Sequence, residues 1–211
     1  MASTGDGAAA KLLDRDALVG WVAARRAAGA RIVFTNGVFD LLHAGHVRYL
    51  WQARAQGSAL VVGVNSDDST RQLKGPQRPL VPQAERAEVL AALASVDAVT
   101  IFAEPTAVAL VAALQPEIYA KGGDYAGAGA GAALQRIPPE ALQRIAAGAV
   151  EFGDPLAGLC ARLPEARAVA EYGGTICLIP YLAGHSTTEL IARIVAAYGP
   201  YGPHPSPAGD A

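Results

Sequence analysis

The stretch RIVFTNGVFDLLHAGHVRYLWQARAQGSALVVGVN, residues 31–65, decides the fold. Residues 31–36 are a short apolar run that ends at Asn36-Gly37, as a strand does before a turn. Residues 45–56 have the spacing of an amphipathic helix, and residues 59–65 are a second, continuously apolar strand. A strand, a helix and another strand of the fully buried type indicate a parallel β-α-β unit.

The same alternation continues on both sides of this unit. The spacing predicts further helices over residues 14–28, 83–95, 106–114 and 186–198. It predicts further strands over residues 97–102, 117–121 and 175–180. The sequence therefore predicts an α/β fold, a doubly wound, Rossmann-like parallel five-stranded sheet with helices on both faces. Ligands of such sheets bind outside the carboxyl ends of the strands.

We expect a single domain over residues 11–198, between disordered tails at residues 1–10 and 199–211 that are rich in small residues or in Pro and Gly. An insertion at residues 126–162 follows the fourth strand and repeats the word LQRI. The two copies are read as short helical pieces around Pro138-Pro139. Three interpretations stay open for this insertion: a lid or substrate contact, an oligomer interface, or a mobile decoration.

Composition narrows the class of protein. The 211 residues carry a formal net charge of −2, which argues against a general nucleic-acid binder. No apolar run is long enough to span a bilayer, and no signal-peptide pattern opens the chain. Cys160 and Cys177 lie in no metal-binding spacing, so we expect two reduced thiols. These features predict a cytoplasmic protein with no membrane partner.

The His-Ala-Gly-His motif is the clearest indication of a functional site in the sequence. His43 and His46 are three residues apart at a helix entrance, so both can face one ligand. The amides and dipole of the first turn favour a phosphate there, and Gly45 lets an anion approach closely. The alternatives are two locally satisfied helix-end histidines or a metal site, for which we find no third ligand in a recognisable spacing.

Three other stretches are candidates. Ser186, Thr187 and Thr188 open the last helix with three hydroxyls, and Ser186 with Glu189 also forms a capping box. Lys74 lies in a predicted loop flanked by Gly and Pro, where a cation can close on a triphosphate or simply face solvent. Residues 121–124 (KGGD) follow a strand, and their glycines let the backbone approach a ligand, although a tight turn needs the same residues.

Residues 35–50 (TNGVFDLLHAGHVRYL) resemble the signature of the HxGH nucleotidyltransferases, the cytidylyltransferase-like superfamily. Within it the chain resembles the D-glycero-D-manno-heptose 1-phosphate adenylyltransferases. The further matching stretches are residues 63–75 (GVNSDDSTRQLKG), 78–80, 85–99, 121–125 (KGGDY) and 186–188. The chain departs from the family at Val38, where Cys is common, at His185, where Tyr or Cys is usual, and in its longer insertion. Too few residues precede position 31 for the sugar kinase domain often fused to this family.

The resemblance implies transfer of AMP from ATP to a heptose 1-phosphate, giving ADP-heptose and pyrophosphate, with Mg²⁺ held by the phosphates and no metal ligands on the protein. It implies a possible homodimer. The implied catalytic residues are His43, His46 and Lys74. The implied nucleotide-binding residues are Asn36, Gly37, Val38, Phe39, Gly45, Arg86, Gly122, Gly123, Asp124, Gly184, Ser186, Thr187 and Thr188. The implied sugar-phosphate-binding residues are Asp40, Asn65, Lys121 and His185.

Other roles stay open for two of these residues. Arg86 is also read as a surface helix charge, and Asp40 as a turn cap or a contact of Mg²⁺. Two rival functions also remain: a cytidylyl- or guanylyltransferase for another sugar or polyol phosphate, and a non-catalytic nucleotide-binding module. A Rossmann oxidoreductase is disfavoured, because no GxGxxG follows the first strand.

Overall fold

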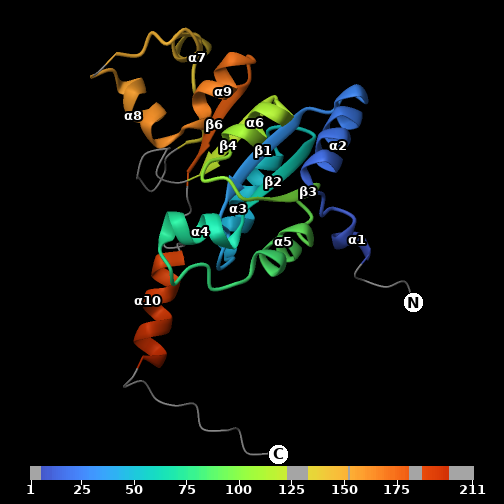
Figure 1. The fold of residues 1–211 in the computed structure, drawn as a ribbon, viewed down its shortest axis with the longest axis vertical. Helices are drawn as coiled ribbons and strands as arrows, with labels where there is room; N and C mark the ends of the chain where they lie inside the picture. Colours follow the sequence, from blue (N-terminus) through green and yellow to red (C-terminus); the bar gives the residue numbers. More distant parts are fainter. Residues whose placement is uncertain (1–5, 123–132, 152, 181–186, 200–211) are drawn as a thin grey trace, which may run out of the picture.

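A six-stranded sheet forms the centre of the computed structural model, which describes residues 6–122, 133–151, 153–180 and 187–199 (Figure 1). The strand order is β3-β2-β1-β4-β6-β5. The strands are β1 (Ile32–Gly37), β2 (Ala59–Asn65), β3 (Ala98–Phe102), β4 (Ile118–Gly122), β5 (Gln135–Arg136) and β6 (Thr175–Ile179). Neighbouring strands are parallel except for β5, which pairs antiparallel with β6.

The position of β1 determines where a ligand can bind. The chain runs from β1 outward through β2 to β3, and then returns to place β4 on the other side of β1. β1 pairs in parallel with both β2 and β4. Successive connections therefore leave β1 and β4 in opposite directions, which opens a crevice at the carboxyl ends of these two strands.

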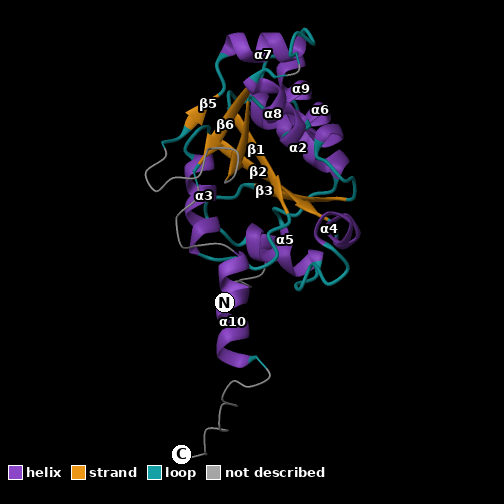
Figure 2. Ribbon diagram, turned by 90° about the vertical axis from the view of Figure 1, so that its left-hand side faces the viewer, coloured by secondary structure: helices purple, strands orange, loops and turns teal. Residues whose placement is uncertain are grey.

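Both faces of the sheet are covered by helices (Figure 2). Side chains alternate along β1: Ile32 and Phe34 enter one apolar cluster, and Val33 enters the other. The first cluster includes residues of α2 (Arg15–Ala27), α6 (Val108–Leu114) and α9 (Glu165–Glu171). The second includes residues of α3 (Ala44–Arg54) and α5 (Gln83–Ala91). The predicted doubly wound α/β fold is confirmed.

The insertion corrects the predicted strand count, because it adds the short edge strand β5 to the five predicted strands. The first LQRI copy contains β5 rather than a helical piece, whereas the second lies in α7 (Pro139–Ala146). Leu142 and Ile145 of α7 join the first apolar cluster, as does Leu159 of α8 (Pro155–Arg162). The described part of the insertion is thus packed into the core and is not a loose decoration.

Two short helices differ from the prediction, and a third helix extends away from the domain. α1 (Asp6–Ala9) forms within the predicted N-terminal tail. α4 (Asp67–Lys74) was not predicted and ends at Lys74, within the stretch predicted as a loop. At its start, Ser66 accepts a hydrogen bond from the Ser69 N–H, and acidic residues fill the first turn. α10 (Thr187–Tyr198) extends away from the domain (Figure 1). Among the described helices, none has the length and apolar character to cross a membrane.

Candidate functional site

A cavity of about 780 Å³ lies at the carboxyl ends of β1 and β4 and is within the size range of small-molecule pockets. It brings together most of the predicted site residues. Those lining it are Asn36, Gly37, Val38, Phe39, Asp40, His43, His46, Asn65, Lys74, Lys121, Gly122, Thr187 and Thr188. Gly45 and Arg86 are not among the lining residues. Gly123, Asp124, Gly184, His185 and Ser186 lie outside the described residues.

His43 and His46 face the cavity from the first turn of α3. His43 is the N-cap, and its Nδ1 accepts the Gly45 N–H at 3.1 Å. The Nδ1 atom of His46 accepts the His43 N–H at 3.4 Å, and the two ring centroids are 4.0 Å apart. A neutral imidazole whose Nδ1 accepts a hydrogen bond carries its proton on Nε2. The capping interactions therefore orient both rings as Nε2–H donors, and Gly45 contributes through its backbone N–H to His43.

His46 is uncharged at neutral pH. Burial lowers the pKa of His46 to about 4, and repulsion from His43 once that ring is protonated at low pH adds to the shift. Its ring also packs edge-on against Phe39 at a centroid distance of 5.7 Å. Phe39 has a φ of 51°, so the turn after β1 is held in a left-handed conformation beside the ring. His46 is thus a fixed, neutral hydrogen-bond donor.

This lowered pKa predicts a pH-dependent stability. In the unfolded chain His46 has its ordinary pKa near 6.5, so the unfolded state binds a proton first as the pH falls. The contribution of His46 to stability is constant at higher pH and is lost between about pH 6.5 and pH 4. When the pH is lowered from 7 to 5, the free energy of unfolding measured in urea should fall in both proteins. The fall should be roughly 1–2 kcal/mol smaller in His46→Gln than in the unmodified protein. Equal losses in the two proteins would contradict the prediction.

Lys121 and Asn36 form the floor of the cavity between β1 and β4. The Lys121 Nζ donates to the Asn36 Oδ1 at 3.0 Å, and the Tyr119 hydroxyl donates to the same oxygen at 2.7 Å. Burial lowers the pKa of Lys121, while the charge of Glu165 opposes that shift. The side chain of Asn36 thus fixes the Lys121 ammonium at the strand ends.

Asp40 lines the cavity and also has a structural role, while its contact with the sugar phosphate or Mg²⁺ stays a prediction. It is 5% exposed, and its Oδ1 accepts the backbone N–H groups of Leu80 and Val81 at 2.8 and 2.9 Å. Its Oδ2 lies 2.6 Å from the Arg78 Nε in an ion pair. A buried carboxylate with these partners fastens the segment after α4 to the turn after β1, as in the alternative reading of Asp40 as a cap.

Arg86 also serves the framework of the site. Its side chain is fully buried, and its guanidinium donates to the carbonyls of Val38, Val81 and Asn65 and to the Asp67 carboxylate. These acceptors belong to the turn after β1, the segment between α4 and α5, the end of β2 and the start of α4. This four-way tie accounts for the burial of the guanidinium, while the predicted phosphate contact of Arg86 stays a prediction.

The remaining predicted residues lie around the rim of the cavity. The Asn65 Nδ2 donates to the Ser69 Oγ at 3.1 Å, so this side chain holds α4 while it lines the cavity. Lys74 is the last residue of α4 rather than a loop residue. Thr187 and Thr188 are the first two residues of α10. The structure thus places a lysine and two threonine side chains beside the paired imidazoles.

Sequence reasoning did not assign eight of the lining residues to the site, among them Thr106, Arg162 and Glu165. The other five are Tyr49, Leu73, Arg78, Pro105 and Pro164. Glu165 is 3% exposed, and its Oε1 accepts the Ala107 N–H at 2.8 Å ahead of α6. No motif marks these positions, although an acidic residue after Pro164 within an apolar stretch is a weak sign of a buried charge.

The described part of the chain contains no group of three His, Cys, Asp or Glu side chains close enough to hold a metal ion. The two acids at the cavity, Asp40 and Glu165, each accept backbone N–H groups. Among the described lining residues, Asp40 is held by its ion pair with Arg78, and Glu165 is the one other acid. The described lining therefore offers no cluster of carboxylates for Mg²⁺, which prefers several oxygen ligands. Cys160 and Cys177 are both free thiols; Cys177 is buried, whereas Cys160 is partly exposed.

Comparison with known proteins gives three findings. Residues 34–138 match the family described as "Cytidylyltransferase-like". The chain is 44% identical to the "Bifunctional protein HldE" of Pelobacter propionicus over 188 residues, 89% of this chain and 32% of that protein. It is 42% identical to the protein of the same name from Geobacter sulfurreducens over 190 residues, 90% of this chain and 32% of that protein. The chain thus spans about a third of the length of these relatives.

One solved structure, titled "Crystal structure of the lipopolysaccharide core biosynthesis protein from Thermoplasma volcanium GSS1", is 24% identical to this chain. The match has a TM-score of 0.47 and covers 73% of this chain and 98% of that one.

Proposed function

The chain belongs to the cytidylyltransferase-like family through residues 34–138, and on this premise we propose that it transfers AMP from ATP to D-glycero-D-manno-heptose 1-phosphate. The products are ADP-heptose and pyrophosphate. One observation carries the proposal: the imidazoles of His43 and His46 and the first residues of α10, Thr187 and Thr188, line a single cavity at the carboxyl ends of β1 and β4. The motifs that resemble heptose 1-phosphate adenylyltransferases support the choice of acceptor.

The reaction is a single in-line displacement. An oxygen of the sugar phosphate attacks the α-phosphorus of ATP, the bond from that phosphorus to the bridging oxygen of the β-phosphate breaks, and pyrophosphate leaves with the electron pair. His43 and His46 donate hydrogen bonds to phosphoryl oxygens on which charge accumulates. Because the pKa of His46 is about 4, this residue acts as a neutral donor at pH 7 and not as an acid.

The nucleotide phosphates lie between α4 and α10. Lys74 at the end of α4 neutralises the charge of the leaving pyrophosphate, and Thr187 and Thr188 bind it with their hydroxyls and backbone N–H groups. The turn after β1, residues 36–39, faces the nucleoside. We keep Gly122, Gly123, Asp124, Gly184 and Ser186 as proposed nucleotide contacts, and His185 as a proposed contact of the sugar phosphate.

Lys121 and Asn65 bind the phosphate of the sugar, since both line the cavity and Lys121 is held at the ends of β1 and β4. Mg²⁺ enters as the counter-ion of the triphosphate. The protein works in the cytoplasm, and a homodimer is its proposed assembly.

The proposal is tested by pyrophosphate release from a matrix of triphosphates and acceptors. ATP, CTP, GTP and UTP are each combined with the heptose 1-phosphate, glucose 1-phosphate and glycerol 3-phosphate. The pair of ATP and heptose 1-phosphate should exceed every other pair by at least about tenfold in kcat/KM. A preference for CTP or GTP with another acceptor would overturn the proposal in favour of that transferase. Nucleotide binding without pyrophosphate release from any pair would indicate a non-catalytic module.

A further inference from the structure

The cavity has two walls that belong to opposite faces of the sheet. His43 and His46 come from α3, on the face that α3 and α5 cover. Thr106 precedes α6, Arg162 ends α8 and Glu165 begins α9, and these helices pack on the other face. We call Thr106, Arg162 and Glu165 the second wall. The ends of β1 and β4 lie between the two walls, so a ligand held by the imidazoles has the second wall opposite it.

The cations of the lining are divided between the two sides of β1 in the strand order. Among the described lining residues the cations are Lys74, Arg78, Lys121 and Arg162, and Arg78 is already in an ion pair with Asp40. Lys74 ends the helix that follows β2, on one side of β1 in the sheet. Lys121 ends β4 on the other side of β1, where Arg162 of the second wall also lies at the cavity. Two anionic substrates that must meet at one phosphorus therefore find cations on both sides of β1.

Glu165 is an unexpected residue in a cavity for phosphates. A carboxylate repels a bare triphosphate, but it accepts hydrogen bonds from hydroxyl groups. The Oε1 of Glu165 accepts the Ala107 N–H at 2.8 Å, and a carboxylate has further lone pairs to offer. Burial lowers the pKa of Lys121, and the negative charge of Glu165 counteracts this shift. A substrate that carries both a phosphate and several hydroxyls matches this combination of charges better than a triphosphate does.

The second wall is built on supported elements. α8 begins at Asp154, whose carboxylate accepts the Leu156 N–H and pairs with Arg144 of α7. Leu159 anchors the same helix in the core. Arg162 is the last residue of this helix and lines the cavity, and its Nε donates to the Gly158 carbonyl of the same helix at 3.1 Å. Sites held on supported helices position their ligands more precisely than sites on loops.

We propose that Arg162 and Glu165 form the acceptor subsite, in which Glu165 accepts hydrogen bonds from the hydroxyls of a sugar phosphate and Arg162 donates to its phosphate. This inference rests on the proposed function and specifies it: the acceptor is a polyhydroxylated phosphate monoester, which Arg162 at the end of α8 and Glu165 at the start of α9 select.

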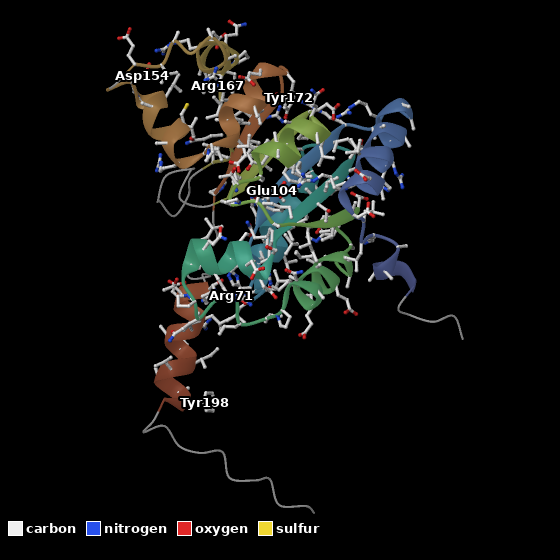
Figure 3. The ribbon with its side chains drawn as sticks, in the orientation of Figure 1. Arg71, Glu104, Asp154, Arg167, Tyr172 and Tyr198 are labelled. Atoms are coloured by element: carbon white, nitrogen blue, oxygen red, sulfur yellow. The ribbon has the colours of Figure 1, made fainter. Side chains whose placement is uncertain are left out.

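The first test compares Arg162→Ala with Arg167→Ala, which removes an arginine of α9 that pairs with Glu171 and lies outside the cavity lining (Figure 3). Arg162→Ala should raise KM for the heptose 1-phosphate by about 10- to 100-fold, the range for a charge-assisted hydrogen bond, and change KM for ATP less than twofold. Arg167→Ala should change neither constant. A comparable rise in KM for ATP, or no change in either KM, would overturn the subsite.

The second test uses Glu165→Gln, which keeps an oxygen for the Ala107 N–H and removes the charge. It should lower kcat/KM for the heptose 1-phosphate about tenfold or more at unchanged KM for ATP. A purely structural role for Glu165 predicts an unchanged kcat/KM in this variant, which would contradict the inference.

Calorimetric titration of heptose 1-phosphate into protein saturated with a non-hydrolysable ATP analogue separates this inference from the proposed function. If the unmodified protein binds the sugar phosphate and Arg162→Ala does not, the subsite stands even if no pyrophosphate is released. If the unmodified protein binds no sugar phosphate, the subsite is overturned.

Discussion

Replacing His46 with alanine should lower kcat by about 10²- to 10³-fold, the usual cost of removing one preorganised donor from a charge-stabilising site. The reason lies in the geometry of α3. The capping contacts of the two Nδ1 atoms place a proton on Nε2, and burial with the neighbouring His43 lowers the pKa of His46 to about 4. The ring therefore donates at neutral pH without carrying a charge, and alanine removes the donor entirely.

The fold should survive this change. The hydrogen bond from the His43 N–H to His46 is long, at 3.4 Å, so its loss should cost less than about 1 kcal/mol. Arg48→Ala is the matched control, since Arg48 is an exposed residue of the same helix and does not line the cavity. It should keep full turnover. Normal kcat in a well-folded His46→Ala protein would remove His46 from the mechanism.

Replacing Arg86 with alanine should destabilise the protein by about 3–5 kcal/mol, because it leaves buried carbonyls and the Asp67 carboxylate without their donor. In a chain of this size that loss lowers the unfolding temperature by roughly 6–20 °C. The guanidinium joins four segments that build the site, so the substitution should also weaken nucleotide binding. Thermal unfolding followed by circular dichroism measures the effect.

Arg71→Ala is the control for this prediction. Arg71 pairs with Asp68 on the surface of α4, where its side chain is 51% exposed (Figure 3). Breaking an exposed pair should cost no more than about 1 kcal/mol. If the two substitutions lowered the unfolding temperature by similar amounts, the four-way tie of Arg86 would have no energetic importance.

The part of the fold that the sequence predicts best is the part decided by local pattern. Residues 59–64 carry no polar side chain, as suits a strand buried on both faces, and the predicted range 59–65 coincides with β2. α4 was missed because its eight residues, DDSTRQLK, are polar and show no apolar period. Its signals were the Ser66 cap, the acids of the first turn and the basic residues of the last, which are weaker than an apolar stripe.

Within the candidate site, too, local sequence pattern decides which residues can be predicted. His43 and His46 lie in one short word whose spacing on a helix is fixed, so their shared orientation could be predicted from sequence. The roles of Asp40 and Arg86 could not, because they depend on partners up to 48 positions away, as between Arg86 and Val38. Arg162 and Glu165 reach the cavity only through the packing of α8 and α9 against the first apolar cluster.

The most direct test of the proposed reaction follows the phosphorus atoms of ATP. The protein is incubated with the heptose 1-phosphate and ATP labelled separately in the α- and γ-phosphates, and the products are separated. Adenylyl transfer predicts that the α label moves into a sugar nucleotide while the γ label leaves in pyrophosphate, in equal amounts. Transfer of the γ label to the sugar phosphate, or retention of both labels in ATP, would contradict the account.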